Sequence, residues 1–144
     1  MTVAISLTLY FIIFSVIGWG FDTFLRSVRR KRWAPIRKIP FSPLYGMGAL
    51  MILWSPAPIR EANPALQFLA FGFVFCLYEW IAGAAILKVI GKRIWDYRER
   101  NFNLGGHTDL FHFFIWGLVG AVTINCVDPA VRSWMGDWAP TALG

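Results

Sequence analysis

Residues 3–25 read VAISLTLYFIIFSVIGWGFDTFL, a run whose only charged residue is Asp22. At 1.5 Å per residue, a helix of this length extends about 35 Å, which is enough to cross the roughly 30 Å hydrocarbon core of a bilayer. The run lacks a basic start and a small-residue cleavage site, so it is typical of a retained span and not of a secretory signal. We therefore expect the first membrane helix here.

Three further apolar runs follow, at about residues 40–59, 65–87 and 110–127. The composition agrees, because 57% of the residues are hydrophobic and only 15% are charged, whereas about a quarter are charged in soluble domains. The sequence therefore predicts an all-α, polytopic membrane helix bundle of about four spans. Residues 1–144 are expected to form a single integral membrane domain.

Prolines interrupt the second apolar run and confine uninterrupted helix to about Leu44–Trp54, roughly 16 Å long. They are Pro40, Pro43, Pro56 and Pro58. Ser42 and Pro43 form a typical helix start, because a serine hydroxyl can cap free amides and proline is harmless at the first helical position. We expect a short or broken span whose segment 40–43 either lines an internal pocket or lies at the interface.

Basic residues are concentrated in the loops at 26–38 and 88–109, which predicts that both loops are cytoplasmic and both chain termini extracytoplasmic. The first loop carries Arg26, Arg29, Arg30, Lys31, Arg32, Arg37 and Lys38. Such a short basic loop between spans indicates contact with anionic lipid headgroups, here by Arg29, Arg30, Lys31 and Arg32, and not with nucleic acid. In the tail, Trp134 and Trp138 are suited to the membrane interface.

Asp22 and Glu79 are ionisable residues inside predicted spans, and such residues are costly there and often functional. Both lie toward the cytoplasmic ends of their helices, so they are expected to share one polar site. Three interpretations remain open: proton or cation coupling, bonding to a tryptophan, tyrosine or backbone group, and pairing with loop arginines or lysines. Among small residues, Gly117 and Ala121 are expected to pack helices together, as is Gly18 near Asp22.

The second basic loop holds a dense polar motif that contains Trp95, Asp96, Tyr97, Asn101, Gly105, Gly106 and His107. It predicts a re-entrant or amphipathic cap, with Trp95 and Tyr97 in the interface and Asp96 bonded to a helix end. His107, Asp109 and His112 match no strong metal signature. We expect no metal, no cofactor and no catalytic residues, and the chain is not predicted to be an enzyme.

From about Phe14 to Pro129 the chain resembles the family of "Putative ABC-transporter type IV" (CmpB-type) membrane proteins. The matching blocks begin with Gly18-Trp19 and the acid Asp22. Further blocks are Pro43 with Tyr45-Gly46-Met47-Gly48-Ala49, Glu79 before an aromatic, Gly91 to Tyr97 with Asn101, Gly105-Gly106 and Trp116-Gly117. Two positions depart from the family pattern: Asp22 replaces the usual glutamate, and a basic run ending in Ile39-Pro40 replaces the usual Asn-Arg-Gly segment.

The resemblance implies a multi-pass protein of the bacterial inner membrane and a permease-like role in transport. Gly91-Lys92-Arg93 lacks the glycines and hydroxyl of a P-loop, so a separate subunit would supply the ATPase. In this hypothesis Asp22, Tyr45, Glu79, Asp96 and Asn101 surround a cytoplasm-facing polar cavity. The alternative is a non-transporting scaffold or accessory subunit that binds lipid headgroups. Membrane lipids and a homo-oligomer or larger complex are the expected partners.

Overall fold

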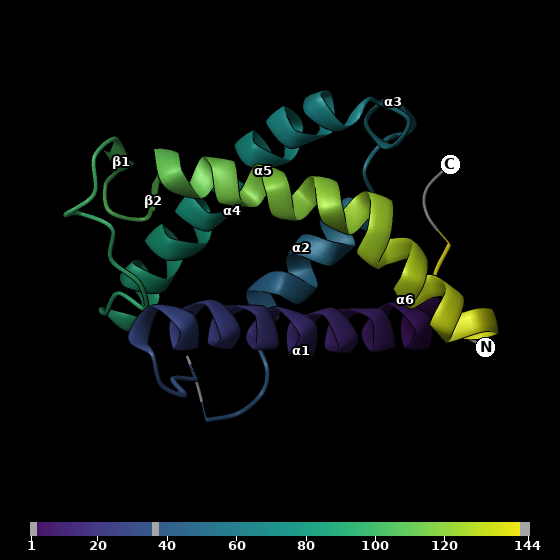
Figure 1. Cartoon of the computed structure of the whole chain (residues 1–144), viewed down its shortest axis with the longest axis horizontal. Coiled ribbons are helices and arrows are strands. Elements are labelled where there is room, and N and C mark those ends of the chain that lie inside the picture. The colour runs from purple at the N-terminus through teal and green to yellow at the C-terminus, as the bar shows by residue number, and fades with distance from the viewer. Residues whose placement is uncertain (1–2, 36–37, 142–144) are drawn as a thin grey trace. The chain divides into compact units, whose positions relative to one another are not determined.

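The computed structural model describes residues 3–35 and 38–141 (Figure 1). Three helical segments are long and apolar enough to cross a membrane, namely Val3–Val28, Pro64–Ile90 and Leu110–Trp138. A fourth, Pro43–Leu53, is apolar but shorter. The predicted helical membrane fold with a short second span is therefore confirmed.

The chain divides into two compact units. The first consists of Met1–Pro56 together with Cys126–Gly144, and the second is the continuous segment Ala57–Asn125. The first unit is therefore built from both ends of the chain, whereas the second is built from its middle.

In the first unit, helix α1 (Val3–Arg30) packs with α2 (Pro43–Leu53) and the terminal helix α6 (Asp128–Met135). Its apolar core consists of Tyr10, Phe14, Ala49, Leu53 and Met135. Helix α1 continues through the first part of the basic segment that the sequence assigns to a loop. Arginine is a good helix former, and cations at a helix C-terminus interact favourably with the helix dipole, so these residues extend the helix.

Helices α1 and α2 approach closely at two glycines. A Cβ atom on Gly18 would overlap the Tyr45 ring, and one on Gly46 would overlap the Ser15 side chain and the Phe11 backbone. Neither position can therefore hold a larger residue without a shift of its neighbours. The predicted packing role of Gly18 is confirmed, while Gly48 is half-buried in the same short helix.

Helix α2 begins at Pro43 as predicted, but the Ser42 side chain forms no capping hydrogen bond, so that part of the prediction is wrong. Instead, the backbone N–H of Ser42 donates to the Ser15 carbonyl at 3.0 Å. Ser42 thus fixes the entry to α2 through its backbone. At the other end α2 stops at Leu53, and the chain then forms the one-turn helix α3 (Ala57–Arg60) at the end of the second apolar run.

The second unit contains α3, α4 (Pro64–Ile90), strands β1 (Asn103–Leu104) and β2 (Thr108–Asp109), and α5 (Leu110–Val122). The Asn63 side chain caps α4 by accepting from the N–H of Leu66 at 3.0 Å. Gly91 ends the helix with φ of 70°, a conformation that glycine adopts readily. The two strands pair antiparallel and form a small hairpin that the sequence did not predict.

Helices α4 and α5 pack through glycines of α5 against phenylalanines of α4. A Cβ atom on Gly117 would lie 2.6 Å from the Phe68 carbonyl oxygen, and one on Gly120 would overlap the Phe71 ring. Gly117 therefore has the packing role that the sequence predicted. Its companion on the contact face is Gly120, which is buried, whereas the predicted Ala121 is only half-buried.

The final apolar helix does not end at Asp128 and Pro129, and this expectation is wrong. Helix α5 passes into a π-helical segment η1 (Thr123–Val127), which leads directly into α6 and the 3₁₀ turn η2 (Gly136–Trp138). A proline inside an α-helix clashes with the carbonyl four residues earlier and removes one hydrogen bond. The wider π turn just before Pro129 relieves this conflict, so the helix continues to Met135.

Candidate functional site

Glu79 is the centre of the candidate site in the second unit, and only 3% of it is exposed. The Tyr97 hydroxyl donates to Glu79 Oε1 at 3.2 Å, and Trp116 Nε1 donates to Oε2 at 3.1 Å. Both carboxylate oxygens therefore have a donor. This arrangement agrees with one of the three interpretations given above, in which an acid inside a span bonds to a tryptophan or tyrosine.

Glu79 and its two hydrogen-bond donors come from three different elements, so Glu79 links these elements. Glu79 itself comes from α4, Trp116 comes from α5, and Tyr97 comes from the loop of residues 91–109 that joins the two helices. Because a buried carboxylate is costly unless its oxygens are bonded, the three elements stabilise one another at this point.

Behind Tyr97, a second layer of polar groups continues toward the start of α5. The Tyr97 ring stacks on His112 with centroids 4.0 Å apart, and His112 Nδ1 lies 2.9 Å from Asp109 Oδ1. Asp109 also caps α5 by accepting from the N–H of His112 at 2.8 Å. Arg100 Nε lies 3.5 Å from Asp109 Oδ2 and completes the layer.

Asp109 is the acid that bonds a helix end, and Asp96 is not, so the prediction for Asp96 is wrong. Asp96 is exposed and forms a bidentate ion pair with the guanidinium of Arg98. The shortest distance, from Arg98 Nη2 to Asp96 Oδ2, is 2.6 Å. The hydrogen bonds from Arg98 lower the pKa of Asp96 to about 2. A surface ion pair of this kind contributes little to folding.

Trp95 and Tyr97 form hydrogen bonds inside the unit through their polar atoms. Trp95 Nε1 donates to the His107 carbonyl at 2.8 Å, and the Tyr97 N–H donates to the Gly106 carbonyl at 3.0 Å. These two aromatic residues tie the loop to itself and to Glu79. Both are half-buried, and their predicted place in the membrane interface stays a prediction.

The turn of the hairpin depends on Gly105 and Gly106, whose φ angles are 61° and 75°. Non-glycine residues are strained in this region. The neighbouring His107 is buried, and its ring lies against Gly83, where a Cβ atom would be 2.7 Å from Nδ1. Burial, and then the charge of Arg93, lower the pKa of His107. Asn101, the remaining motif residue, is exposed in the preceding turn.

In the first unit, Asp22 has a tyrosine partner as well. The Tyr45 hydroxyl donates to Asp22 Oδ1 at 2.6 Å, which links α1 to α2 beside the contact of Gly18 with the Tyr45 ring. Trp19, one turn before Asp22, lies edge-on to Trp33 with centroids 6.4 Å apart. Asp22 and Glu79 belong to different units, and a site shared by the two stays a prediction.

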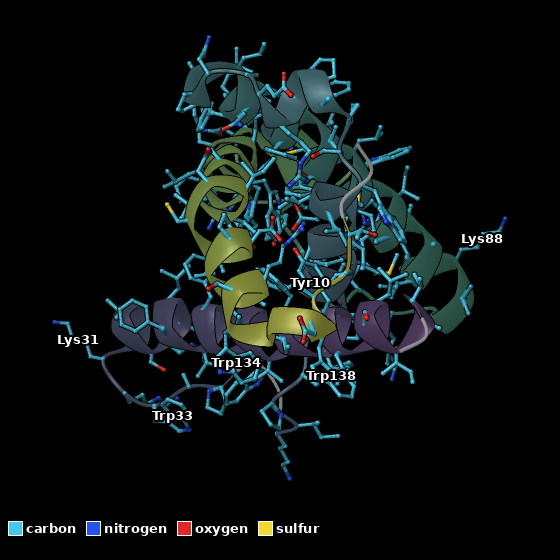
Figure 2. All side chains as sticks on the ribbon, turned by 90° about the vertical axis from the view of Figure 1, so that its right-hand side faces the viewer. Tyr10, Lys31, Trp33, Lys88, Trp134 and Trp138 are labelled. Carbon is cyan, nitrogen blue, oxygen red and sulfur yellow. The ribbon has the colours of Figure 1, made fainter. Side chains whose placement is uncertain are left out.

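Among the predicted headgroup contacts, Arg30, Lys31 and Arg32 are exposed at the end of α1 and just beyond it. Figure 2 shows Lys31 extending away from the ribbon. The side chain of Arg29 lies outside the described part of the structure. Contact of these exposed cations with lipid phosphates stays a prediction.

Sequence reasoning missed two polar pairs, one buried and one partly buried. The Tyr10 hydroxyl donates to Asp128 Oδ1 at 2.7 Å in the first unit, and Asn125 Nδ2 donates to Gln67 Oε1 in the second. Gln67 in turn donates to the carbonyls of Ile59 and Arg60, and so caps the end of α3. The only sequence signal for these pairs is that each residue is polar within an apolar run.

These features define a polytopic helical membrane protein whose polar residues inside the apolar helices are bonded to one another. The family model described as "Putative ABC-transporter type IV" matches residues 9–143. The chain therefore belongs to this family, as its motifs indicated. Comparison with curated proteins and with solved structures finds no match.

Proposed function

We propose that this chain is a membrane subunit of an ATP-driven transport assembly in the bacterial inner membrane, and that a separate subunit supplies the ATPase. The family match and the three long apolar helices support this proposal. The two basic loops would be cytoplasmic, with both termini on the opposite side.

The observation that carries most weight is the bonding of Glu79. Because Tyr97 and Trp116 each donate to one of its oxygens, Glu79 fixes the 91–109 loop to two spanning helices. A transport subunit that works with a separate ATPase needs a cytoplasmic loop that moves together with its membrane helices. In this proposal Glu79 supplies that connection and is a positioning residue, while transported ions follow another route.

Copurification tests the proposal directly. The full-length tagged chain is extracted from its native membranes with a mild detergent, and the eluate is assayed for ATP hydrolysis. We expect an ATP-hydrolysing partner to elute with the chain and to hydrolyse ATP faster in its presence than alone. Recovery of the chain with no ATPase activity, from membranes in which transport is active, would contradict the proposal.

The Glu79→Gln variant separates positioning from ion coupling. The glutamine side chain keeps one acceptor oxygen, but its amide nitrogen cannot accept, so one of the two hydrogen bonds is lost. We expect ATPase stimulation and transport to fall together, by roughly tenfold or less. Glu99→Gln is the matched control, because Glu99 is an exposed glutamate of the same loop. Loss of ion-driven transport with full ATPase stimulation would instead assign ion coupling to Glu79.

A non-transporting scaffold is the second candidate, and a different observation favours it. Asp22, Glu79 and Asp128 each have a tyrosine donor within their own unit. Side chains bonded in this way lock helices together and need no transported ion. This function predicts that the chain copurifies with other membrane proteins and bound lipid, while its deletion changes the amount of the assembly and leaves transport per assembly unchanged.

A further inference from the structure

The 91–109 loop exposes large apolar side chains although it lies outside the spanning helices. Phe102 is 80% exposed, Leu104 is 61% exposed and Ile94 is 50% exposed. In the same loop Trp95 and Tyr97 have their polar atoms bonded inward. The loop therefore has an inner side that binds α4 and α5 and an outer side that is apolar.

The level of the loop along α4 is set by two contacts. The His107 ring lies against Gly83, and the Tyr97 hydroxyl reaches Glu79. Gly83 precedes Ile90, the last residue of α4, by seven residues, which is about 10 Å along the helix, and Glu79 precedes it by about 16 Å. The loop thus folds back beside the last turns of α4 and does not extend beyond its end. In Figure 1 the hairpin lies where α5 begins, at the left of the view.

This level corresponds to the membrane surface. Helix α4 has 27 residues and is about 40 Å long, whereas the hydrocarbon core is about 30 Å thick. Its C-terminal turns, which include Lys88, therefore pass through the headgroup region. The loop starts directly after these turns, at Gly91, and so begins in the same region, while its contacts with Gly83 and Glu79 reach the edge of the hydrocarbon core.

The backbone at Phe102 holds its side chain outward. Phe102 has φ of 54°, which lies in the left-handed region that non-glycine residues rarely adopt. The next residue keeps the turn in place, because Asn103 Nδ2 donates to the Arg100 carbonyl at 2.8 Å and Asn103 Oδ1 accepts from Gly106 at 2.9 Å. The exposed aromatic ring is thus presented by a turn that is bonded on both sides.

The segment that carries these exposed apolar side chains is also basic. Residues 88–109 contain five basic and three acidic side chains, and two of the acids, Asp96 and Asp109, are paired with arginines of the loop. Lys88 and Lys92 are exposed, and Figure 2 shows Lys88 extending away from α4. Apolar tips with flanking cations are complementary to a surface of anionic phospholipid.

We propose that the 91–109 loop is a membrane-surface anchor. Phe102 and Leu104 insert into the headgroup region of the cytoplasmic leaflet, and Lys88 and Lys92 bind the phosphates of anionic phospholipids there. This anchor is separate from the first basic loop, and it does not depend on whether the chain transports a substrate.

Fluorescence quenching in nanodiscs tests the insertion. In the full-length chain with Cys76→Ala and Cys126→Ala, Phe102→Cys is labelled with an environment-sensitive dye. The discs contain phosphatidylcholine with or without phosphatidylglycerol, and nitroxide-labelled lipids quench at a shallow or a deep position. We expect blue-shifted emission and stronger quenching by the shallow nitroxide. We also expect at least a twofold increase in quenching when phosphatidylglycerol is included.

Two labelled positions calibrate the result. Glu99→Cys, an exposed polar neighbour in the loop, should be quenched by aqueous iodide and little by lipid nitroxides. Phe73→Cys, which is 67% exposed in the middle of α4, should be quenched best by the deep nitroxide. If the Phe102 label behaves like the Glu99 label, the anchor is disproved. The apolar side chains then either bind a soluble partner or are exposed to solvent.

The charge contribution is tested by Lys88→Gln together with Lys92→Gln. We expect this double variant to lose the phosphatidylglycerol dependence of quenching at Phe102 while keeping its elution volume and helical circular dichroism. Unchanged phosphatidylglycerol dependence would overturn the role of the lysines. Lys31→Gln, in the other basic segment, is the matched control and should leave quenching at Phe102 unchanged.

Discussion

The hydroxyl of Tyr10 donates a 2.7 Å hydrogen bond to Asp128, which lies 118 positions later in the chain. Both residues are almost completely buried, with exposed fractions of 0% and 2%. The bond ties the first helix to the terminal helix α6 in the middle of the apolar core of the first unit. A buried carboxylate is tolerated only when donors satisfy its oxygens, so the core depends on this tyrosine.

Tyr10→Phe should therefore destabilise the protein. The ring is retained and packing is preserved, but Asp128 loses a donor, which costs about 1–3 kcal/mol. We expect a lower Tm in detergent or nanodiscs, measured by thermal loss of the monodisperse species. Tyr78→Phe is the control, because the Tyr78 hydroxyl forms no hydrogen bond within residues 3–35 and 38–141, the part of the chain that the structure describes. An unchanged Tm for Tyr10→Phe would show that this bond does not stabilise the core.

Two glycine substitutions are expected to change the Tm differently. Gly117→Ala places a Cβ atom 2.6 Å from the Phe68 backbone carbonyl, so α4 and α5 must separate, at a cost of about 1–3 kcal/mol. Gly20→Ala meets no atom within 4 Å and lies inside α1, where alanine is favoured over glycine by about 1 kcal/mol. We expect Tm to fall for the first and to stay equal or rise for the second. Equal losses would mean that helix contact does not limit residue size at position 117.

The hydrogen bonds at Glu79 should be energetically coupled. A double-mutant cycle with Tyr97→Phe and Trp116→Phe measures whether the two donors act together on one carboxylate. We expect each single change to destabilise the protein by about 1–2 kcal/mol and the pair to be non-additive by at least about 0.5 kcal/mol. Strict additivity would show that the two donors stabilise the protein independently of each other and would contradict the coupling through Glu79.

The 91–109 loop should weaken in mild acid through His107. The pKa of His107 is lowered by burial and by Arg93, so the unfolded chain binds a proton more readily than the folded one. The neutral ring therefore stabilises the loop fully above the ordinary histidine pKa of about 6.5, and this contribution is lost as pH falls below that value. Hydrogen exchange of residues 95–107 should accelerate from pH 7 to pH 5, after correction for intrinsic rates. His107→Gln should lack this acceleration beyond the intrinsic rates.

The Asp96–Arg98 ion pair should respond at a lower pH. Arg98 depresses the pKa of Asp96 to about 2, so the pair persists above the ordinary aspartate pKa of about 4 and is lost as pH falls toward 2. A carbon NMR titration of the Asp96 carboxyl group measures this directly. Arg98→Gln should return the midpoint to near the ordinary value, whereas an unshifted midpoint in the unmodified chain would contradict the pairing.

The membrane class and the approximate limits of α2 and α4 could be predicted because they depend on local properties, namely run length, charge and proline. The short α2 follows from Pro43 and Pro56 in the same way. The continuation through Pro129 could not be predicted, since it depends on a π turn that forms within a particular helix. The capping of α5 by Asp109 was not predicted. Aspartate is a common N-cap residue, and the sequence offers two candidates, Asp96 in the Trp95-Asp96-Tyr97 block and Asp109.

The site could be predicted only in part for a related reason. The sequence indicates that Glu79 and Asp22 are unusual, because a charged residue in an apolar run is costly wherever it lies. It does not indicate their partners, since Tyr97 and Trp116 are 18 and 37 positions from Glu79. Which residues form such a pair depends on how the helices pack, and the sequence pattern of one helix does not indicate which residues of another helix it contacts.

The division of the chain into a continuous middle unit and a first unit made from both ends has a consequence for biosynthesis. The middle unit is complete once Asn125 has left the ribosome, whereas Tyr10 must wait for Asp128. At about 5–20 residues per second, that interval is roughly 6–24 seconds. During this time α1 is already inserted with a tyrosine whose final acceptor has not been made, so a membrane insertase or chaperone that shields nascent helices would act on this helix first.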